Sequence, residues 1–278
     1  MSERSFVQSL NAVCESHRSL VCVGLDPDPA RMPVSDVLEF NKAIIDATHD
    51  LVCAYKPNFA FYEALGIPGL QVLEGTVEYI RKCAPDAVVI ADAKRGDIGN
   101  TSRAYARALF DVFGFDAATV SPYLGEDSVR PFLEYADKGI FMLCRTSNPG
   151  AKDLQDLPVG QPPEPLYMHV ARMAKRWNTH GNVCLVVGAT YPEELGRVRR
   201  ICPDIPILVP GVGAQAGDLA AAVRNGVDAR GRLAVVNSSR GIIYASGGSD
   251  YARAARKAAE SLRDSINAVL EREGKGWS

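Results

Sequence analysis

Two carboxylates and a lysine follow the apolar run 87–91, at Asp92, Lys94 and Asp97. Side chains alternate along a strand, so Asp92 and Lys94 should point to the same side, while Asp97 should lie in the turn beyond. A carboxylate beside an ammonium at a strand end is by itself more often a structural ion pair than a catalytic pair. The rest of the chain favours the catalytic interpretation.

A second lysine, Lys56, follows the apolar run 51–55. We expect Lys56, Lys94, Asp92 and Asp97 to form one cluster of two cations and two anions. Burial of four charges is costly, so such a cluster in a cleft indicates a function, the alternative being a structural network. Neighbouring carboxylates keep a lysine protonated, which makes Lys94 a proton donor rather than a Schiff-base nucleophile. That arrangement suits a reaction in which a carbanion forms and is protonated.

Short apolar runs that recur along the chain predict the strands that position these residues. The runs are 20–23, 51–55, 87–91, 117–120, 139–143, 183–187, 206–209 and 233–236. Most are continuously apolar, which is typical of parallel strands covered on both faces, and stretches with helical spacing separate them. The sequence therefore predicts one α/β domain over 1–278, a (β/α)8 TIM barrel with an extra helix over 3–17. A doubly wound open sheet is the main alternative.

Polar or glycine-rich segments follow nearly every predicted strand, and this distribution favours the barrel. Barrel enzymes gather their chemistry where the strands end, at the carboxyl face. The residues concerned are Asp26, Lys56, Asp92, Lys94, Ser121, 146–148, 211–215 and 238–241. They predict one site built from many strands.

The last two predicted strands are followed by a candidate phosphate site. Gly211 and Gly213 would let the backbone approach a ligand, while Arg240 would supply positive charge beside the amides of Ser239 and Gly241. Barrels commonly bind phosphate between these two loops. The alternative is a pair of tight turns with a surface arginine. The spacing does not fit a dinucleotide fingerprint.

Composition limits the partners and the cofactors. The net charge of −2 argues against a nucleic-acid or anionic-membrane partner, and no apolar run approaches membrane-spanning length. The chain begins with no secretory or transit pattern, so we expect a cytoplasmic protein. Its seven cysteines lack metal-binding spacing and suggest reduced core residues, and nothing in the sequence indicates a metal.

The segment 148–165 is rich in proline, glycine and aspartate and predicts a long loop without helical or strand periodicity. A loop of this length usually has a function as a lid or a subunit contact. A mobile insertion without a role is the alternative.

Six segments of the chain together resemble the orotidine 5'-phosphate decarboxylase family. The central one is Asp92-x-Lys94-x-x-Asp97-Ile98-x-x-Thr101. The others, in matching order, are 24–26, 56–58, 146–150, 210–215 and the turn at Arg240. The resemblance spans nearly the whole chain, and the longer loop after the fifth strand is similar to that of the type 2 subgroup found in many bacteria.

This resemblance implies an activity and a role for each charged residue. The activity is the decarboxylation of orotidine 5'-monophosphate to UMP and carbon dioxide, the last step of de novo UMP synthesis. Lys94 would protonate C6 as carbon dioxide leaves, and Asp92 would lie beside the substrate carboxylate. Lys56 and Asp97 would complete the network, and no cofactor would be needed.

The resemblance also implies a homodimer, in which Asp97 and Thr101 enter the partner's site. The remaining implied contacts are Asp26 with the ribose hydroxyls, Ser147 with the pyrimidine edge, Gln215 with base and phosphate, and Arg240 with the phosphate.

The same residues leave two alternative functions. A sugar-phosphate decarboxylase or hexulose-phosphate synthase of the same superfamily would share Asp92 and Lys94 but needs magnesium, and Lys56 stands where an acidic ligand would be expected. A non-catalytic nucleotide-binding regulator could keep the phosphate pocket, but it would gain nothing from the buried charges.

Overall fold

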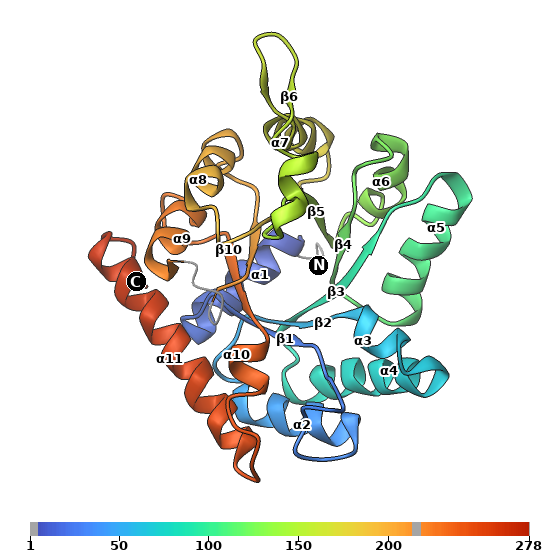
Figure 1. Ribbon diagram of the computed structural model, residues 1–278, viewed down its shortest axis with the longest axis vertical. Coiled ribbons are helices and arrows are strands. Elements are labelled where there is room, and N and C mark those ends of the chain that lie inside the picture. The colour runs from blue at the N-terminus through green and yellow to red at the C-terminus, as the bar shows by residue number, and fades with distance from the viewer. Residues whose placement is uncertain (1–4, 213–217, 278) are drawn as a thin grey trace.

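Eight parallel strands close into a barrel in a computed structural model, which describes residues 5–212 and 218–277 (Figure 1). Around the barrel the order is β1, β10, β9, β8, β5, β4, β3, β2. The strands are β1 (Val21–Leu25), β2 (Ala54–Pro57), β3 (Val88–Arg95), β4 (Ala117–Val120), β5 (Gly139–Arg145), β8 (Val183–Val187), β9 (Ile207–Pro210) and β10 (Ala234–Ser238). The prediction of a TIM barrel is confirmed, and the open sheet is excluded.

The strands are apolar because both of their faces are covered. Every residue of β1, β2, β4, β8 and β10 is buried. The outer layer consists of α2 (Val37–Thr48), α3 (Phe59–Glu63), α4 (Gly66–Cys83), α5 (Gly99–Arg107) with its π-helical extension (Ala108–Val112), α6 (Glu126–Leu133), α7 (Leu166–Trp177), α8 (Pro192–Ile201), α9 (Leu219–Gly226), α10 (Arg240–Ile243) and α11 (Tyr251–Arg272). The barrel thus holds the carboxyl ends of all eight strands at one face.

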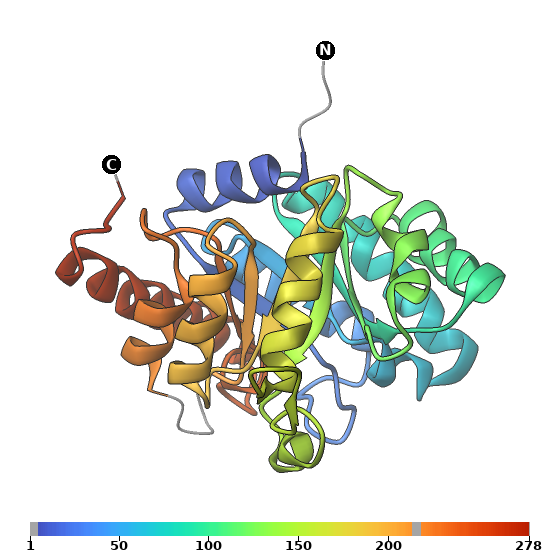
Figure 2. The ribbon, with the colours of Figure 1, turned by 90° about the horizontal axis from the view of Figure 1, so that it is seen from above.

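The extra amino-terminal helix, α1 (Phe6–His17), lies across the opposite face of the barrel (Figure 2). Ser5 and Gln8 form a capping box that starts it. The Phe6 ring packs edge-on against Phe141, with centroids 6.0 Å apart. A side chain at Gly139 would lie 2.4 Å from that ring, so the glycine makes room for the helix. α1 therefore closes the end of the barrel away from the predicted site.

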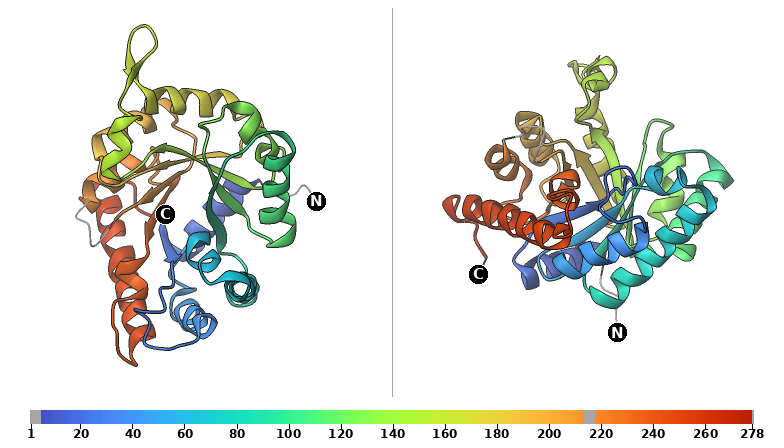
Figure 3. Two further views of the ribbon diagram at one scale, coloured as in Figure 1. Left: turned by 45° about the vertical axis from the view of Figure 1, so that its right-hand side comes forward. Right: turned by 60° about the horizontal axis from the view of Figure 1, so that its bottom comes forward.

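The segment 148–165 is more ordered than the sequence predicts. It contains a 3-10 helix (Pro149–Asp153) and a two-stranded antiparallel hairpin, β6 (Pro158–Val159) with β7 (Glu164–Pro165). The hairpin projects outward from the barrel between β5 and α7 (Figures 1 and 3). The sequence predicted a long connection but not these short elements, because elements of five and two residues leave no periodic pattern to detect.

Two further observations concern the described residues as a whole. None of the helices in ranges 5–212 and 218–277 is long and apolar enough to cross a membrane. All seven cysteines are free thiols and six are buried, as expected of core residues.

Candidate active site

The ends of β2 and β3 bring Lys56, Asp92 and Lys94 into contact. Lys56 Nζ lies 2.8 Å from Asp92 Oδ2, and Lys94 Nζ lies 2.6 Å from Asp92 Oδ1. The carboxylate also accepts a hydrogen bond from Thr119 Oγ1 at 3.1 Å. The side chain of Lys56 is 4 % exposed and that of Asp92 11 %, whereas that of Lys94 is 52 % exposed. The cluster thus holds a buried ion pair and one ammonium group open to the barrel mouth.

Charge pairing keeps this cluster ionised. Burial by itself would raise the pKa of Asp92, but the ammonium groups of Lys56 and Lys94 outweigh it and hold that pKa below its ordinary value. Burial would likewise lower the pKa of Lys56, yet the carboxylates of Asp92 and Asp26 hold it above its ordinary value. Near neutral pH the site therefore contains a fixed anion in contact with a buried cation.

The backbone at Lys94 is unusual. Its φ of +45° is left-handed, and the pairing of β3 with β4 is irregular between Ala91 and Arg95. The Lys94 N–H donates to Thr119 Oγ1 at 2.9 Å, which fixes the turned backbone. This conformation costs a non-glycine residue about 1–2 kcal/mol, and such strain concentrates at functional sites. Asp92 and Lys94 share one space as predicted, although a bulge replaces the regular alternation.

Asp97 and Thr101 lie outside this three-residue cluster. Asp97 is in the loop before α5, where its Oδ1 accepts a hydrogen bond from the Ile98 N–H at 2.7 Å, and Thr101 is exposed on α5. Within the described part of a single chain, Asp97 forms no ion pair with either lysine. The structure thus brings together three of the four charges predicted to meet.

A cavity of about 170 Å³ lies beside the cluster, at the ends of β1, β9 and β10. Its lining consists of Asp26, Gly211, Val212, Asn237, Ser238, Ser239, Arg240 and Gly241. Gly211 has a φ of +88°, a conformation that favours glycine. The predicted phosphate residues therefore meet in one cavity. Gly213 and Gln215 lie outside the described residues.

In the rest of the barrel mouth, glycine backbone lies close to the side chains of neighbouring loops. A side chain at Gly24 would lie 1.8 Å from Ser239 Oγ, and one at Gly188 would lie 2.8 Å from Ser147 Cβ. Ser147 is exposed and lies beside Gly211, whose added Cβ would be 3.9 Å from its Oγ. The serine predicted to contact the base therefore stands next to the predicted phosphate cavity.

Sequence analysis missed a buried arginine that holds the loop after β5. Arg145 is fully buried and forms an ion pair with Asp156 through Nε at 3.2 Å. Its guanidinium lies 4.0 Å from the centre of the Tyr191 ring and donates to the Thr146 carbonyl at 3.0 Å. Gln155 accepts from the Thr146 N–H at 2.8 Å. The sequence signal that could have revealed Arg145 is its position, a charged residue directly before the polar segment 146–148.

Tyr244, just after α10, was also missed. Its hydroxyl donates to the Asp26 carbonyl at 3.1 Å and accepts from the Asp28 N–H at 2.6 Å. The Arg31 guanidinium lies 4.1 Å from the centre of its ring. Tyr244 thus joins the segment that follows Arg240 to the loop that carries Asp26.

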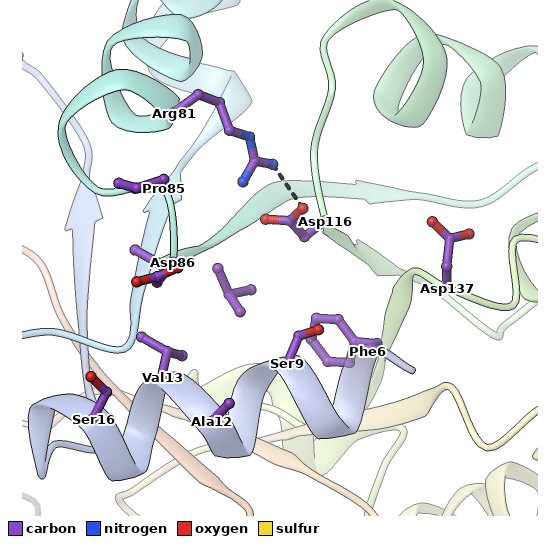
Figure 4. Close-up of a pocket in the computed structure, with 12 residues that line it drawn as sticks. Phe6, Ser9, Ala12, Val13, Ser16, Arg81, Pro85, Asp86, Asp116 and Asp137 are labelled. Carbon is purple, nitrogen blue, oxygen red and sulfur yellow. Dashed lines mark ion pairs between the residues drawn. The ribbon is translucent and has the colours of Figure 1, made fainter. Parts of the chain in front are cut away.

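A larger cavity, about 420 Å³, lies at the opposite end of the barrel between α1 and the strand starts (Figure 4). Arg81 and Asp116 point toward one another across it, 2.8 Å apart. This amino-terminal face of a barrel ordinarily supports stability rather than chemistry. We therefore assign the site to the carboxyl face, where the buried charges and the smaller cavity adjoin.

Comparison with known proteins agrees with this geometry. A family model described as "Orotidine 5'-phosphate decarboxylase / HUMPS family" matches residues 19–258. Orotidine 5'-phosphate decarboxylase from Dehalococcoides mccartyi is 53% identical over 271 residues, covering 96% of this chain and 99% of the relative. The enzyme of that name from Roseiflexus castenholzii is 52% identical over 273 residues, covering 96% and 98%.

A solved structure shows the same fold. The OMP decarboxylase of Leishmania donovani superposes with a TM-score of 0.84 at 42% identity, covering 96% of this chain and 98% of that one. Family model, full-length relatives and fold all agree, so this chain belongs to the orotidine 5'-phosphate decarboxylase / HUMPS family.

Proposed function

We propose that the cluster of Lys56, Asp92 and Lys94 is the catalytic centre with which this enzyme decarboxylates orotidine 5'-monophosphate to UMP and carbon dioxide. The bond between C6 and the carboxylate carbon breaks, and its electron pair stays on C6. Lys94 Nζ donates a proton to C6, so that a C–H bond replaces the C–C bond. The observation that carries the proposal is the ammonium of Lys94, half-exposed at the barrel mouth and 2.6 Å from the Asp92 carboxylate.

Asp92 acts through its fixed negative charge. Lys56 holds it in place from the buried side at 2.8 Å. A substrate carboxylate beside Asp92 is repelled, and this repulsion falls as carbon dioxide leaves, while the charge that develops on C6 is attracted to Lys94. Interactions that are stronger in the transition state than in the ground state accelerate the reaction.

The neighbouring cavity binds the rest of the nucleotide in this proposal. Arg240, with the amides of Ser239 and Gly241, holds the phosphate, and Asp26 binds ribose hydroxyls. Ser147 contacts the pyrimidine edge from its place beside Gly211. Gly213 and Gln215 complete the phosphate and base contacts.

We further propose that the enzyme is a homodimer with sites shared across the interface. Large apolar side chains are exposed after β2, β3 and β4, at Phe61, Ile98, Tyr105, Tyr123 and Leu124. Two of them, Ile98 and Tyr105, belong to the same segment as Asp97 and Thr101, which a single chain leaves outside the cluster. Exposed apolar surface of this kind marks interaction sites, and a second copy would carry Asp97 and Thr101 to the partner's charges.

Magnesium-dependent chemistry of a sugar-phosphate synthase fits this site poorly. The Lys56 ammonium contacts Asp92 at 2.8 Å, where a divalent cation would need an oxygen ligand. The even charge balance favours a small-molecule substrate over nucleic acid or membrane, and the free thiols suit the cytoplasm.

The direct test is conversion of orotidine 5'-monophosphate to UMP, followed by ultraviolet absorbance in excess chelator. We expect rapid conversion by the parent and none by Lys94→Ala, with both proteins folded by circular dichroism. Conversion that stops with chelator and returns with magnesium would support the metal-dependent reaction instead. A parent that binds UMP without turnover would support the regulator.

A further inference from the structure

Asn237 is a buried polar residue in the nucleotide cavity to which the mechanism above gives no role. It lies on β10, paired laterally with Cys22 of β1 and Pro210 of β9, and it is 6 % exposed. Its Oδ1 is fully buried and has no hydrogen-bond partner in the described ranges. The residue lines the cavity of about 170 Å³ together with Asp26 and Arg240.

A second unpaired acceptor belongs to another residue that lines the same cavity. Asp26 Oδ1 is also buried, and no donor for it occurs among the residues that the structure describes. Buried polar atoms are almost always hydrogen-bonded, because an unpaired one loses its water without replacement. Two orphaned acceptors lining one cavity therefore indicate a ligand that brings donors.

The glycine opposite keeps the space in front of Asn237 open. A Cβ at Gly24 would lie 3.3 Å from Asn237 Oδ1 and 1.8 Å from Ser239 Oγ. Any larger residue at this position of β1 would cover the amide oxygen and push against the phosphate loop. The glycine therefore leaves the amide of Asn237, a residue of the cavity lining, without a side chain over it from β1.

The type of orphaned atom identifies the part of the ligand that meets it. A carbonyl oxygen and a carboxylate oxygen accept hydrogen bonds, and a phosphate dianion offers no donor to either. Sugar hydroxyls do offer donors. In a nucleotide the sugar is bonded directly to the phosphate, so a phosphate held by Arg240 places the sugar close beside it. Ribose hydroxyls thus match both acceptors.

We propose that Asn237 is a substrate-binding residue whose side-chain carbonyl accepts a hydrogen bond from a ribose hydroxyl, so that it selects nucleotides that carry this hydroxyl. The proposal rests on the proposed nucleotide site. Asn237 acts beside Asp26, and the two acceptors divide the two sugar hydroxyls between them.

The test is a thermodynamic cycle of ligand and protein. Calorimetry measures the dissociation constants of UMP, 2'-deoxyUMP and 3'-deoxyUMP with the parent and with Asn237→Ala. In the parent, loss of the hydroxyl that contacts Asn237 should weaken binding about tenfold, the usual effect of one hydrogen bond with its buried partner left unpaired. In Asn237→Ala the ratio of the dissociation constants with and without that hydroxyl should fall to about one. The corresponding ratio for the other hydroxyl should stay as in the parent.

A second variant keeps the test informative if Asn237→Ala does not fold. Asn237→Asp retains an acceptor at the same place, so it should keep the preference for the hydroxyl even if overall affinity falls. Loss of that preference in a folded Asn237→Asp would contradict the proposal.

A matched control separates binding from stability. Asn182 is also buried with an unpaired Oδ1, but it lies at the start of β8, where its amide donates to the Leu133 carbonyl at 3.1 Å. Asn182→Ala should lower stability and leave both ligand ratios unchanged. Unchanged ratios in Asn237→Ala would overturn the role of Asn237 alone, whereas failure of the parent to bind UMP would overturn the nucleotide site as well.

Discussion

Removing Lys56 alone should destabilise the enzyme more than removing Lys56 and Asp92 together. In Lys56→Met, Asp92 keeps its position in the barrel, but its remaining cation is Lys94, whose side chain is 52 % exposed and screened by water. Loss of one member of a buried ion pair typically costs 3–5 kcal/mol. Because Lys94 and Thr119 still contact the carboxylate, we expect the lower end, about 3 kcal/mol.

The double variant Lys56→Met/Asp92→Leu removes both buried charges and their desolvation cost. Lys94 loses its partner but remains in contact with water. Asp26 loses a neighbouring cation but no direct ion pair, because its carboxylate forms none with Lys56 among the described residues. Apolar replacement of a buried pair is often neutral or stabilising, so the double variant should lie within about 1 kcal/mol of the parent. The two substitutions are thus strongly non-additive, with a coupling of about 2 kcal/mol or more.

Equilibrium urea unfolding at pH 7 without nucleotide, followed by circular dichroism, measures these differences. A control is Arg256→Met, which breaks a surface pair with Asp50 whose side chains are 38 % and 48 % exposed. That loss should stay below about 1 kcal/mol. A double variant that loses at least as much stability as Lys56→Met would refute the reasoning, as would a single-variant loss no larger than that of the control.

The shifted pKa values predict how the difference in unfolding free energy between the parent and Lys56→Met depends on pH. The pKa of Asp92 is held below 3.8, so its contribution is present above that pH and is lost only as pH falls through the lower folded value. The pKa of Lys56 is held above 10.5, so its contribution is present below that pH and is lost as pH rises through the higher folded value. The difference between parent and Lys56→Met should therefore be flat from about pH 5 to 9.

Further substitutions test the remaining assignments. Lys94→Ala should abolish turnover and leave UMP affinity nearly unchanged by calorimetry; a large loss of affinity would make Lys94 a structural residue. Arg240→Ala should weaken the binding of UMP by about 3 kcal/mol and leave the binding of uridine unaffected, since only UMP has the phosphate for a charge-assisted contact. Equal losses of affinity for both ligands would contradict the phosphate assignment. Inactive Asp97→Ala and Lys94→Ala chains should recover activity in confirmed mixed dimers, and inactive mixed dimers would exclude a shared site. Gly24→Ala, whose methyl would meet Ser239 Oγ at 1.8 Å, should raise the KM for the nucleotide and cost about 1–3 kcal/mol of stability in urea unfolding; an unchanged KM would show that the loop yields freely.

The strands could be predicted because burial on both faces imposes a continuous apolar pattern. Their ends were less predictable. β3 and β5 run on to Arg95 and Arg145, beyond the last apolar residue of each run. These arginines continue the strands because each has an acidic partner, Glu63 for Arg95 and Asp156 for Arg145. The sequence alone shows the charge but not the partner.

The same reason explains which site residues were found and which were missed. Lys56, Asp92 and Lys94 stand out because charges directly follow apolar runs. Asn237 does not stand out, since it looks like one polar residue at a strand end, and only its burial and unpaired oxygen distinguish it. Asp97 was expected in the same cluster, but in the described part of one chain it lies in the loop before α5 and forms no ion pair with either lysine.

The outward hairpin of β6 and β7 offers a position for protein engineering. Residues 160–163 at its tip are exposed, while Glu164, the first residue of β7 after the tip, pairs with Arg172 of α7 at 2.8 Å. An inserted peptide between Gly160 and Gln161 would lengthen a turn that is closed by its own strand pairing, and loop-closure entropy grows only slowly with length. An affinity tag or a surface anchor placed there would leave both chain ends free and the mouth of the barrel accessible to substrate.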